Sequence, residues 1–258
     1  MVDVQNRRDR RQIDIDKVGI KNIRYPVSLL DKHNKIQHTV ADINMYVSLP
    51  RKYKGTHMSR FVEILNMYQR EIDISSLSDM LKQIKNKFLS DAAHLEMKFP
   101  YFISKKAPVS RLEGLMEYMC SLRASLDKKN NFDLAIGVEV PVNALCPCSK
   151  EISRYGAHNQ RGVVRVWIRM NTFIWIEDLI SQIELCASSD VFSLLKREDE
   201  KYVTEKSYRN PVFVEDIVRK VTRKLMKDKR ISRFTVESEN MESIHNHNAY
   251  AFVIRDNL

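Results

Sequence analysis

The most constraining feature of the sequence is an order of strand-like and helix-like patterns that occurs twice along the chain. The first half gives two strands, two helices and two strands, at 18–30, 38–49, 59–70, 76–89, 94–103 and 113–126. The second half gives the same order, at 133–145, 162–170, 174–186, 212–227, 232–239 and 248–255. The order of elements repeats, but the residues of the two halves do not match, so the chain has no repeat at the level of individual residues.

This order predicts an α+β fold with two units, each a β-β-α-α-β-β antiparallel sheet with both helices on one face. We expect a flexible charged arm over 1–17, a first unit over 18–128 and a second over 129–258. In the second unit the link between the helices is longer and acidic at Arg197-Glu198-Asp199-Glu200. A four-stranded sheet alone leaves two open edges, which natural proteins cover or pair. We therefore expect sheets joined edge to edge into barrels, and hence an oligomer.

Glycine is scarce, and this excludes two common ways of binding a nucleotide. The 258 residues include 6 glycines, whereas average usage of about 7 % would give roughly three times as many. No two glycines form G-x-G, and G-x-x-x-x-G-K-[ST] is absent. Rossmann and Walker sites are excluded, because both need glycines where the backbone approaches phosphate. A nucleotide would have to be held by side chains.

The net charge of +10 indicates an anionic partner, whether nucleic acid, phosphate ester or membrane surface. No apolar run approaches 18 residues, so we expect no membrane span. The arginine-rich N-terminus lacks the apolar stretch of a signal peptide. Four cysteines without a secretory signal are expected to remain thiols in the cytoplasm.

The segment Leu145-Cys146-Pro147-Cys148-Ser149-Lys150 directly follows a predicted strand. A loop at a strand end suits a reactive or metal-ligating sulfur, and the nearby Lys150 would favour a thiolate. Equally, the two cysteines can be buried thiols that behave as small apolar side chains. His158 lies in the same inter-strand loop among polar and small residues, so it is either a solvated surface group or a ligand next to Cys146.

Glu242-Ser243-Ile244-His245-Asn246-His247 lies between the last two predicted strands. Alternation in an extended segment puts His245 and His247 on one face, where they can bind metal, relay protons or contact phosphate. A thiolate, an imidazole and a carboxylate (Glu200 or Glu242), with water in the fourth position, match a catalytic rather than a structural zinc site.

Two helix starts also carry candidate residues. Glu215 follows Asn210-Pro211 at the start of a helix, where a carboxylate either complements the helix dipole or accepts two parallel N–H bonds from a purine edge. The segment Lys54-Gly55-Thr56-His57-Met58-Ser59-Arg60 opens the first helix. It is either a capped helix start with a solvated arginine or an anion site at a helix N-terminus.

Taken together, these segments resemble the type IB family of GTP cyclohydrolase I. The resemblance covers nearly the whole chain. It rests on the following segments in this order: Asp14-Ile15-Asp16-Lys17-Val18-Gly19, Lys54–Phe61, Cys146–Lys150, His158-Asn159-Gln160-Arg161 and Glu242–His245. It implies tunnelling-fold (T-fold) units that assemble into barrels, a cytoplasmic homotetramer with active sites at subunit interfaces, and hydrolysis of a cyclic amidine. The implied reaction converts GTP and water to 7,8-dihydroneopterin triphosphate and formate, the first step of tetrahydrofolate synthesis.

The resemblance also implies roles for individual residues. Cys146 and His158 match metal ligands, with Glu200 as the third ligand and Glu242 as an alternative carboxylate for a different metal. Glu215 matches the carboxylate that binds the guanine N1–H and 2-amino group, and His245 resembles the acid–base group, with His247 as a further proton donor and Glu242 beside them. We chose Ser59, Arg60 and Lys150 as triphosphate contacts from charge and position alone.

One divalent metal per site is implied, and its identity stays open. A thiolate ligand suits Zn²⁺, whereas two carboxylates would admit Mn²⁺ or Fe²⁺.

Two other functions are compatible with parts of the sequence. A 7-cyano-7-deazaguanine reductase is another T-fold enzyme, in which Cys146 would be a covalent nucleophile; His158, Glu200 and Glu242 favour a metal instead. A basic nucleic-acid-binding module would explain the charge. However, the aromatic residues are not interleaved with lysine and arginine on one strand face as a stacking platform requires. We therefore expect GTP as the partner, with no nucleic acid and no membrane.

Overall fold

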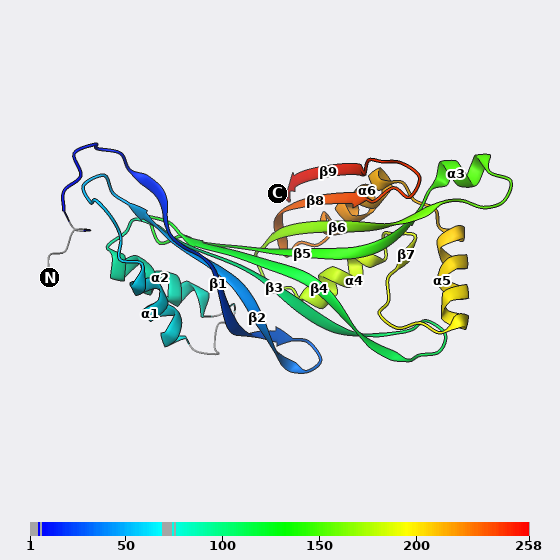
Figure 1. Ribbon diagram of the computed structural model, residues 1–258, viewed down its shortest axis with the longest axis horizontal. Coiled ribbons are helices and arrows are strands. Elements are labelled where there is room, and N and C mark those ends of the chain that lie inside the picture. The colour runs from blue at the N-terminus through cyan, green and yellow to red at the C-terminus, as the bar shows by residue number, and fades with distance from the viewer. Residues whose placement is uncertain (1–4, 6, 69–73, 75, 258) are drawn as a thin grey trace. The chain divides into compact units, whose positions relative to one another are not determined.

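The computed structural model describes residues 5, 7–68, 74 and 76–257 (Figure 1). Over these residues the chain forms the following elements: β1 (Ile15–Asp31), β2 (Lys35–Leu49), α1 (Ser59–Met67), α2 (Leu77–Phe88), β3 (Ala93–Lys106), β4 (Glu113–Leu126), β5 (Phe132–Leu145), α3 (Pro147–Ile152), β6 (Asn159–Met170), α4 (Ile176–Glu184), β7 (Ser189–Asp190), α5 (Arg197–Arg209), α6 (Val214–Leu225), β8 (Ile231–Asn240) and β9 (Ala249–Asp256). The expected first helix extends to Arg70, which lies outside the described residues.

The strands pair in the order β1-β2-β3-β4-β5-β6-β8-β9, and β7 pairs with β5. The pairs β1–β2, β2–β3, β5–β7, β6–β8 and β8–β9 are antiparallel, which confirms the predicted α+β fold with an antiparallel sheet. The chain divides into two compact units. Unit 1 comprises Met1–Pro100 and Ser121–Ile136, and unit 2 comprises Tyr101–Cys120 and Gly137–Leu258. The long strands β3, β4 and β5 contribute residues to both.

In unit 1, two amphipathic helices bury their apolar faces. The buried side chains recur every three or four residues, as helical periodicity requires: Phe61, Ile64 and Leu65 on α1 and Leu77, Met80, Leu81 and Ile84 on α2. The rings of Phe61 and Phe88 stack with centroids 4.2 Å apart. Each such side chain contributes about 1.5–3 kcal/mol on burial, so packing rather than helix propensity stabilises these short helices.

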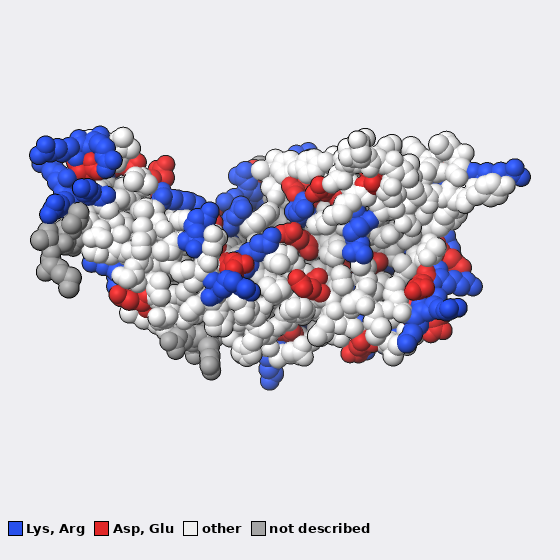
Figure 2. Space-filling view, viewed as in Figure 1, with Lys and Arg blue, Asp and Glu red and all other residues white. Residues whose placement is uncertain are grey.

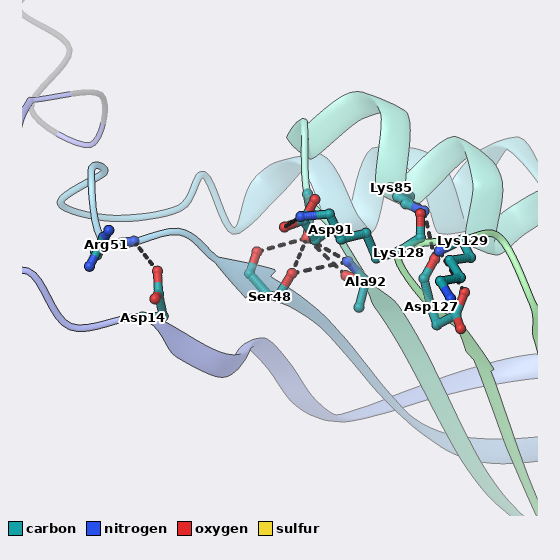
Figure 3. A network of polar contacts seen from close by, with 10 residues as sticks. Asp14, Ser48, Arg51, Lys85, Asp91, Ala92, Asp127, Lys128 and Lys129 are labelled. Atoms are coloured by element: carbon teal, nitrogen blue, oxygen red, sulfur yellow. Dashed lines mark hydrogen bonds and ion pairs between the residues drawn. The ribbon is translucent and has the colours of Figure 1, made fainter.

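Polar contacts fix the ends of the unit 1 elements (Figure 3). The ammonium of Lys85, in the last turn of α2, donates to the backbone oxygens of Asp127 at 2.6 Å and Lys128 at 3.2 Å. This joins α2 to the turn between β4 and β5. Beside it, Ser48 Oγ accepts the Ala92 N–H at 3.0 Å. In the first contact a cation, and in the second a hydroxyl, pairs with backbone groups that would otherwise lack a hydrogen-bond partner.

The N-terminal segment lies along the loop that precedes α1. Lys54 N–H donates to Arg7 O, and Gly55 N–H donates to Gln5 O, each at 3.0 Å. Of the expected arm 1–17, residues 1–4 and 6 lie outside the described residues, and Ile15–Lys17 begin β1. Figure 2 shows lysine and arginine side chains gathered over this end of unit 1.

In unit 2, α4 and α6 supply the apolar layer against the sheet. Their buried residues are Leu179, Ile180 and Ile183 on α4 and Val214, Ile217, Val218, Val221 and Leu225 on α6. The alternating inward positions of β6 and β8 complete this core, with Val164, Val166, Ile168, Phe234 and Val236. The predicted alternation of these strands is confirmed.

Three elements of unit 2 were not predicted. The acidic link holds the short strand β7 and the thirteen-residue helix α5, so the link is not simply a longer connection. The buried residues of α5 are Asp199 and Ser207, and its anchors are therefore polar rather than an apolar stripe. The segment after Cys146, expected as a loop, forms the short helix α3 with Pro147 at its start, a favoured position for proline.

An ionic cluster lies within unit 2 between β3, β4, α4 and β7. Lys105 Nζ lies 2.6 Å from Glu184 Oε1 and 3.5 Å from Asp190 Oδ2. Tyr118 donates its hydroxyl hydrogen to the same Glu184 oxygen at 2.6 Å. Burial and the charge of Glu184 raise the pKa of Tyr118 well above its usual value, so its hydroxyl stays a donor. Lys206 of α5 reaches Asp190 at 2.8 Å, which ties α5 to this cluster.

Within the described part of the chain, no helix is both long and apolar enough to span a bilayer.

Candidate active site

Cys146 lies at the point where β5 ends and α3 begins. Its extended backbone makes it the N-cap of α3, and its sulfur accepts the N–H of Ser149 at 3.4 Å. The Cys146 sulfur is therefore a hydrogen-bond acceptor. Cys146 is partly exposed, whereas Cys148 is exposed. Of the two cysteines in this segment, Cys146 has the setting that a ligand or nucleophile needs.

His158 lies directly beside Cys146, which confirms that the loop brings these two residues together. The N–H of Cys146 donates to His158 O at 3.1 Å. Ser149 bridges them a second time, because its hydroxyl accepts the His158 N–H at 3.1 Å and lies 3.3 Å from Cys146 O. The His158 side chain is 14 % exposed, so it is not a solvated surface group. Its position is set by the backbone at the paired ends of β5 and β6.

Glu242 reaches the same place from the end of β8. Met241 N–H donates to Arg161 O at 2.9 Å, which holds the chain after β8 against the start of β6. Glu242 Oε2 lies 3.9 Å from His158 Nδ1, and Glu242 Oε1 accepts a hydrogen bond from Gln160 Nε2 at 3.3 Å. Within unit 2, the structure thus brings the backbone of Cys146 and the side chain of Glu242 each next to His158.

A backbone hydrogen bond links the segment before Glu215 to the residue before Cys146. The N–H of Val212, three residues before it, donates to the carbonyl of Leu145 at 3.1 Å, next to Cys146. Glu215 itself is exposed in the first turn of α6, and its carboxylate makes no hydrogen bond or ion pair with a described residue. It is available to a ligand at the edge of the cysteine–histidine cluster.

Lys150 takes a different partner from the one expected. Its ammonium donates to the carbonyl of Tyr208 at 2.6 Å and lies 4.5 Å from the centre of the Tyr208 ring. The lysine therefore binds the C-terminal turn of α5, where a cation complements the helix dipole. No contact between Lys150 and the Cys146 sulfur occurs in the described residues.

Glu200 lies at the opposite end of α5. Eight residues separate it from Tyr208, which corresponds to about 12 Å along a helix. Its neighbour Asp199 fixes this end by accepting the N–H groups of Val109 at 2.8 Å and Ser110 at 2.9 Å. Glu200 is exposed, and the structure does not bring it to Cys146. Its role as a ligand stays a prediction.

The donors at Cys146 and His158 fit a divalent metal in kind, because a thiolate and an imidazole are ligands that zinc prefers. Yet among the residues that the structure describes, no three histidine, cysteine, aspartate or glutamate side chains are grouped closely enough to hold a metal ion. One chain therefore provides a cysteine–histidine pair with a carboxylate near the histidine, and the complete ligand set stays a prediction.

His245 and His247 lie together in the loop between β8 and β9. Their rings stack with centroids 5.1 Å apart and planes 20° from parallel. The predicted pairing is confirmed, although the segment bends rather than continuing as a strand. Both rings are exposed and close in sequence to Glu242, a position from which imidazoles can exchange protons with a ligand.

Unit 1 holds a separate cavity of about 180 Å³, lined by Val47, Ser48, Leu49, Tyr53, Gly55, Thr56, His57, Arg60, Lys87, Phe88 and Leu89. Arg60 is its cation, because the Lys87 ammonium is paired with Glu63 at 2.6 Å, and Arg60 Nη1 lies 3.4 Å from Lys87 O. The buried Thr56 hydroxyl has no hydrogen-bond partner among the described residues. Ser59 is exposed at the first position of α1. A cationic cavity with an unused hydroxyl suits an anion.

Gln160 is the member of the cluster that the sequence analysis did not single out. It is buried, and it contacts both His158 and Glu242. A signal was present: Gln160 has the same parity as the inward positions Gly162, Val164, Val166 and Ile168, so strand alternation places an amide on a buried face. A buried amide needs polar partners.

The sequence is similar to that of one protein family over nearly its whole length. A family model described as type I GTP cyclohydrolase folE2 matches residues 1–251. Proteins named GTP cyclohydrolase FolE2 from Syntrophotalea carbinolica and Geotalea uraniireducens are 61 % and 57 % identical, covering 98 % and 99 % of this chain and 94 % of each relative. The protein of that name from Syntrophobacter fumaroxidans is 54 % identical and covers 99 % of both chains.

Solved structures with a similar fold have unrelated sequences. Uricase from Arthrobacter globiformis gives a TM-score of 0.56 at 8 % identity and covers 93 % of both chains. Urate oxidase from Bacillus subtilis 168 gives 0.55 at 8 % identity, covering 93 % of this chain and 98 % of that one. These neighbours support the tunnelling-fold arrangement of antiparallel strands and helices, and at this identity they inform the fold alone.

Proposed function

Because the chain belongs to the type I GTP cyclohydrolase FolE2 family, we propose how its own residues carry out that reaction. The protein is a GTP cyclohydrolase of the folate pathway, a hydrolase that consumes GTP and water and forms 7,8-dihydroneopterin triphosphate and formate. Family membership favours this activity over the nitrile reductase of another T-fold family. The observation that carries the residue assignment is the direct backbone pairing of Cys146 with His158, beside Glu242 and the start of α6.

We assign the metal to Cys146 and His158. The third ligand is Glu200 or Glu242, and Zn²⁺, Mn²⁺ and Fe²⁺ are the candidate ions. When bound, such a metal supplies Lewis-acid activation of the water that hydrolyses the purine ring at C8. Glu242 is held near His158, whereas no described contact links Glu200 to Cys146 or His158, and we propose that Glu200 would act from a second chain.

Glu215 binds the guanine edge. A carboxylate accepts two parallel N–H bonds, which matches the N1–H and 2-amino group of guanine. The Val212–Leu145 hydrogen bond places the base of α6 next to the cysteine, and the Glu215 carboxylate is exposed and without a described partner. In this proposal, the guanine held by Glu215 has its five-membered ring at the cysteine–histidine pair.

For the triphosphate we propose Arg60 and Ser59 as contacts within unit 1. Lys150, in unit 2, stays a candidate contact, for which its ammonium must leave the Tyr208 carbonyl that it binds here. Arg60 lines the cavity next to Thr56 and His57, and Ser59 contributes a hydroxyl at the start of α1. Arginine and backbone N–H groups at a helix start are strong phosphate donors. With this assignment, the anionic partner that the positive net charge indicates is a nucleoside triphosphate rather than any polyanion.

His245 and His247 move protons during ring opening and closure. His245 protonates a purine nitrogen as the C8 bond to nitrogen breaks, and formate leaves after the second hydrolytic step. Opening of the ribose, its rearrangement and the final ring closure need further transfers, for which the stacked His247 is the second donor. A well-placed acid or base of this kind contributes about 10²–10⁴ in rate.

The active enzyme is a homo-oligomer, and we propose a homotetramer with sites between chains. Strand β9 pairs only with β8 in the described sheet, which leaves its other edge open. Apolar side chains are also exposed around the cysteine–histidine pair: Ile152, Tyr155, Tyr208, Phe213 and Ile244. Ile152 and Tyr155 are 85 % and 87 % exposed, an arrangement typical of an interface. We place this oligomer in the cytoplasm, where its four free thiols stay reduced.

The test is direct. Purified protein is incubated with GTP and Zn²⁺, Mn²⁺ or Fe²⁺, and formate is measured together with the fluorescent pterin produced by oxidation of the product. The proposal predicts both products in equal amounts with at least one metal. Metal-independent reduction of a nitrile substrate by a nicotinamide cofactor, without formate from GTP, would support the reductase instead.

A further inference from the structure

Gln160 connects His158 to Glu242 through its side-chain amide. Its oxygen lies 2.9 Å from His158 Nδ1, and its nitrogen lies 3.3 Å from Glu242 Oε1. Gln160 is the second residue of β6 and is 6 % exposed. Its two partners are also largely buried, because the side chains of His158 and Glu242 are 14 % and 13 % exposed. The three side chains form a continuous polar path within unit 2.

The chemistry of these partners fixes where the imidazole hydrogen lies. An ionised glutamate only accepts hydrogen bonds, so the amide must turn its NH₂ group toward Glu242 and its oxygen toward His158. The amide oxygen in turn only accepts, so His158 must carry its hydrogen on Nδ1. The lone pair of neutral His158 is then on Nε2.

The other groups around the ring agree with this assignment. Ser243 Oγ lies 3.5 Å from Nδ1, and Glu242 Oε2 lies 3.9 Å from the same nitrogen. All three contacts of the ring therefore lie on the Nδ1 side. Among the described residues, Nε2 has no hydrogen-bond partner and is open to a ligand.

We infer that Gln160 is a positioning residue that holds His158 with its hydrogen on Nδ1 and so presents Nε2 as the metal-binding nitrogen. This inference rests on the metal site proposed above. Histidine ligands usually donate their second N–H to an acceptor, which fixes the ring and strengthens the ligand. Here a buried amide is that acceptor, and Glu242 holds the amide in orientation.

Loss of the amide leaves Glu242 Oε1 without its donor and leaves the Nδ1–H of His158 only the longer contacts to Ser243 Oγ and Glu242 Oε2. Removing such an outer partner of a metal ligand typically costs 10- to 100-fold in metal affinity. Gln160→Leu removes both contacts at nearly the same volume. Gln160→Glu keeps an acceptor toward His158, loses the donor toward Glu242 and places a second carboxylate beside it, so it tests the His158 half of the bridge.

The experiment measures the tautomer and the metal affinity separately. Protein labelled with ¹⁵N-histidine is examined without metal at about pH 8.5, where an ordinary histidine is neutral, by two-bond ¹H–¹⁵N correlation. The His158 signals are identified by their loss in His158→Ala. Zn²⁺ affinity is measured by competition with a chromophoric chelator. Gln83→Leu, at an exposed position of α2, is the matched glutamine control, and circular dichroism confirms that each variant is folded.

We expect the Nδ1–H tautomer at His158 in the wild type, in Gln83→Leu and in Gln160→Glu. In Gln160→Leu the hydrogen should shift toward Nε2, and Zn²⁺ affinity should fall 10- to 100-fold, with Gln160→Glu recovering most of that loss. A wild-type hydrogen on Nε2, or a Gln160→Leu variant with unchanged tautomer and affinity, would overturn the inference. If Cys146→Ala leaves Zn²⁺ affinity unchanged, the metal proposal fails instead, and the metal-free spectra still decide whether Gln160 fixes the ring.

Discussion

Replacing Lys105 with methionine should lower the stability of unit 2 substantially, because the lysine neutralises two carboxylates that are largely buried. Its ammonium lies 2.6 Å from Glu184 and 3.5 Å from Asp190, and it also lies 4.5 Å from the centre of the Phe192 ring. The side chains of Lys105 and Glu184 are only 13 % and 12 % exposed. Methionine keeps most of the aliphatic stem, so the main loss is the charge.

The size of the effect follows from what remains after the change. Removing one partner of a buried ion pair costs about 3–5 kcal/mol, because the other charge stays buried without compensation. Here Glu184 keeps the Tyr118 hydroxyl at 2.6 Å and Asp190 keeps Lys206 at 2.8 Å, so we expect the lower end, about 3 kcal/mol. For a chain of this size, that corresponds to a fall in Tm of about 6–12 °C.

The adjacent residue provides the control. Lys106 also pairs with a glutamate, Glu113 at 3.1 Å, but both side chains are more than half exposed. Lys106→Met should change Tm by less than about 2 °C. Thermal unfolding is followed by circular dichroism at one fixed protein concentration, because any association between chains would make Tm depend on concentration. Equal shifts for the two variants, or a Lys105→Met protein as stable as the wild type, would refute the assignment of a buried ionic cluster.

Three further outcomes are expected. Glu215→Gln should raise KM for GTP about 10- to 100-fold while bound metal stays constant; unchanged KM would remove the guanine role. Arg60→Met should weaken binding of GTP at least about 10-fold but leave guanosine binding unaltered in a competition assay. Burial acts to raise the pKa of Asp190, but the Lys206 hydrogen bond and the Lys105 charge outweigh it and the pKa is lowered. Its stabilisation is therefore complete above the unfolded pKa, about 4, and is lost as pH falls through the lower folded pKa. Tm should accordingly fall more steeply below about pH 4 in the wild type than in Asp190→Asn.

The strands and the apolar helices could be predicted because their physics is periodic. Inward residues of β6 and β8 alternate, and α2 and α6 bury side chains every three or four residues, so the sequence alone places these elements to within a few residues. The helix α5 was not predicted, because Asp199, Lys206 and other polar groups hold it in place and leave no apolar periodicity to recognise. Its signals were an acidic first turn and basic residues Lys206 and Arg209 in the last turn.

The candidate site could be predicted in part for a related reason. Cys146 and His158 share one inter-strand loop, so pairing of the flanking strands brings them together. The contact between Gln160 and Glu242 joins residues 82 positions apart, and it depends on how β8 lies against β6. Glu200 came from the family resemblance; its neighbour Asp199 anchors their end of α5 to the turn before β4, and its role as a ligand stays a prediction.

The central claim is that Cys146, paired with His158 at the strand ends, holds the catalytic metal. The most direct test is bound metal per chain, measured by inductively coupled plasma mass spectrometry on proteins purified identically with Cys146→Ala and Cys148→Ala. Cys148 is exposed and two residues away, so it controls for the loss of a thiol. We expect Cys146→Ala to lose its metal and its formate production, while Cys148→Ala keeps both. Full metal content and activity in Cys146→Ala would contradict it.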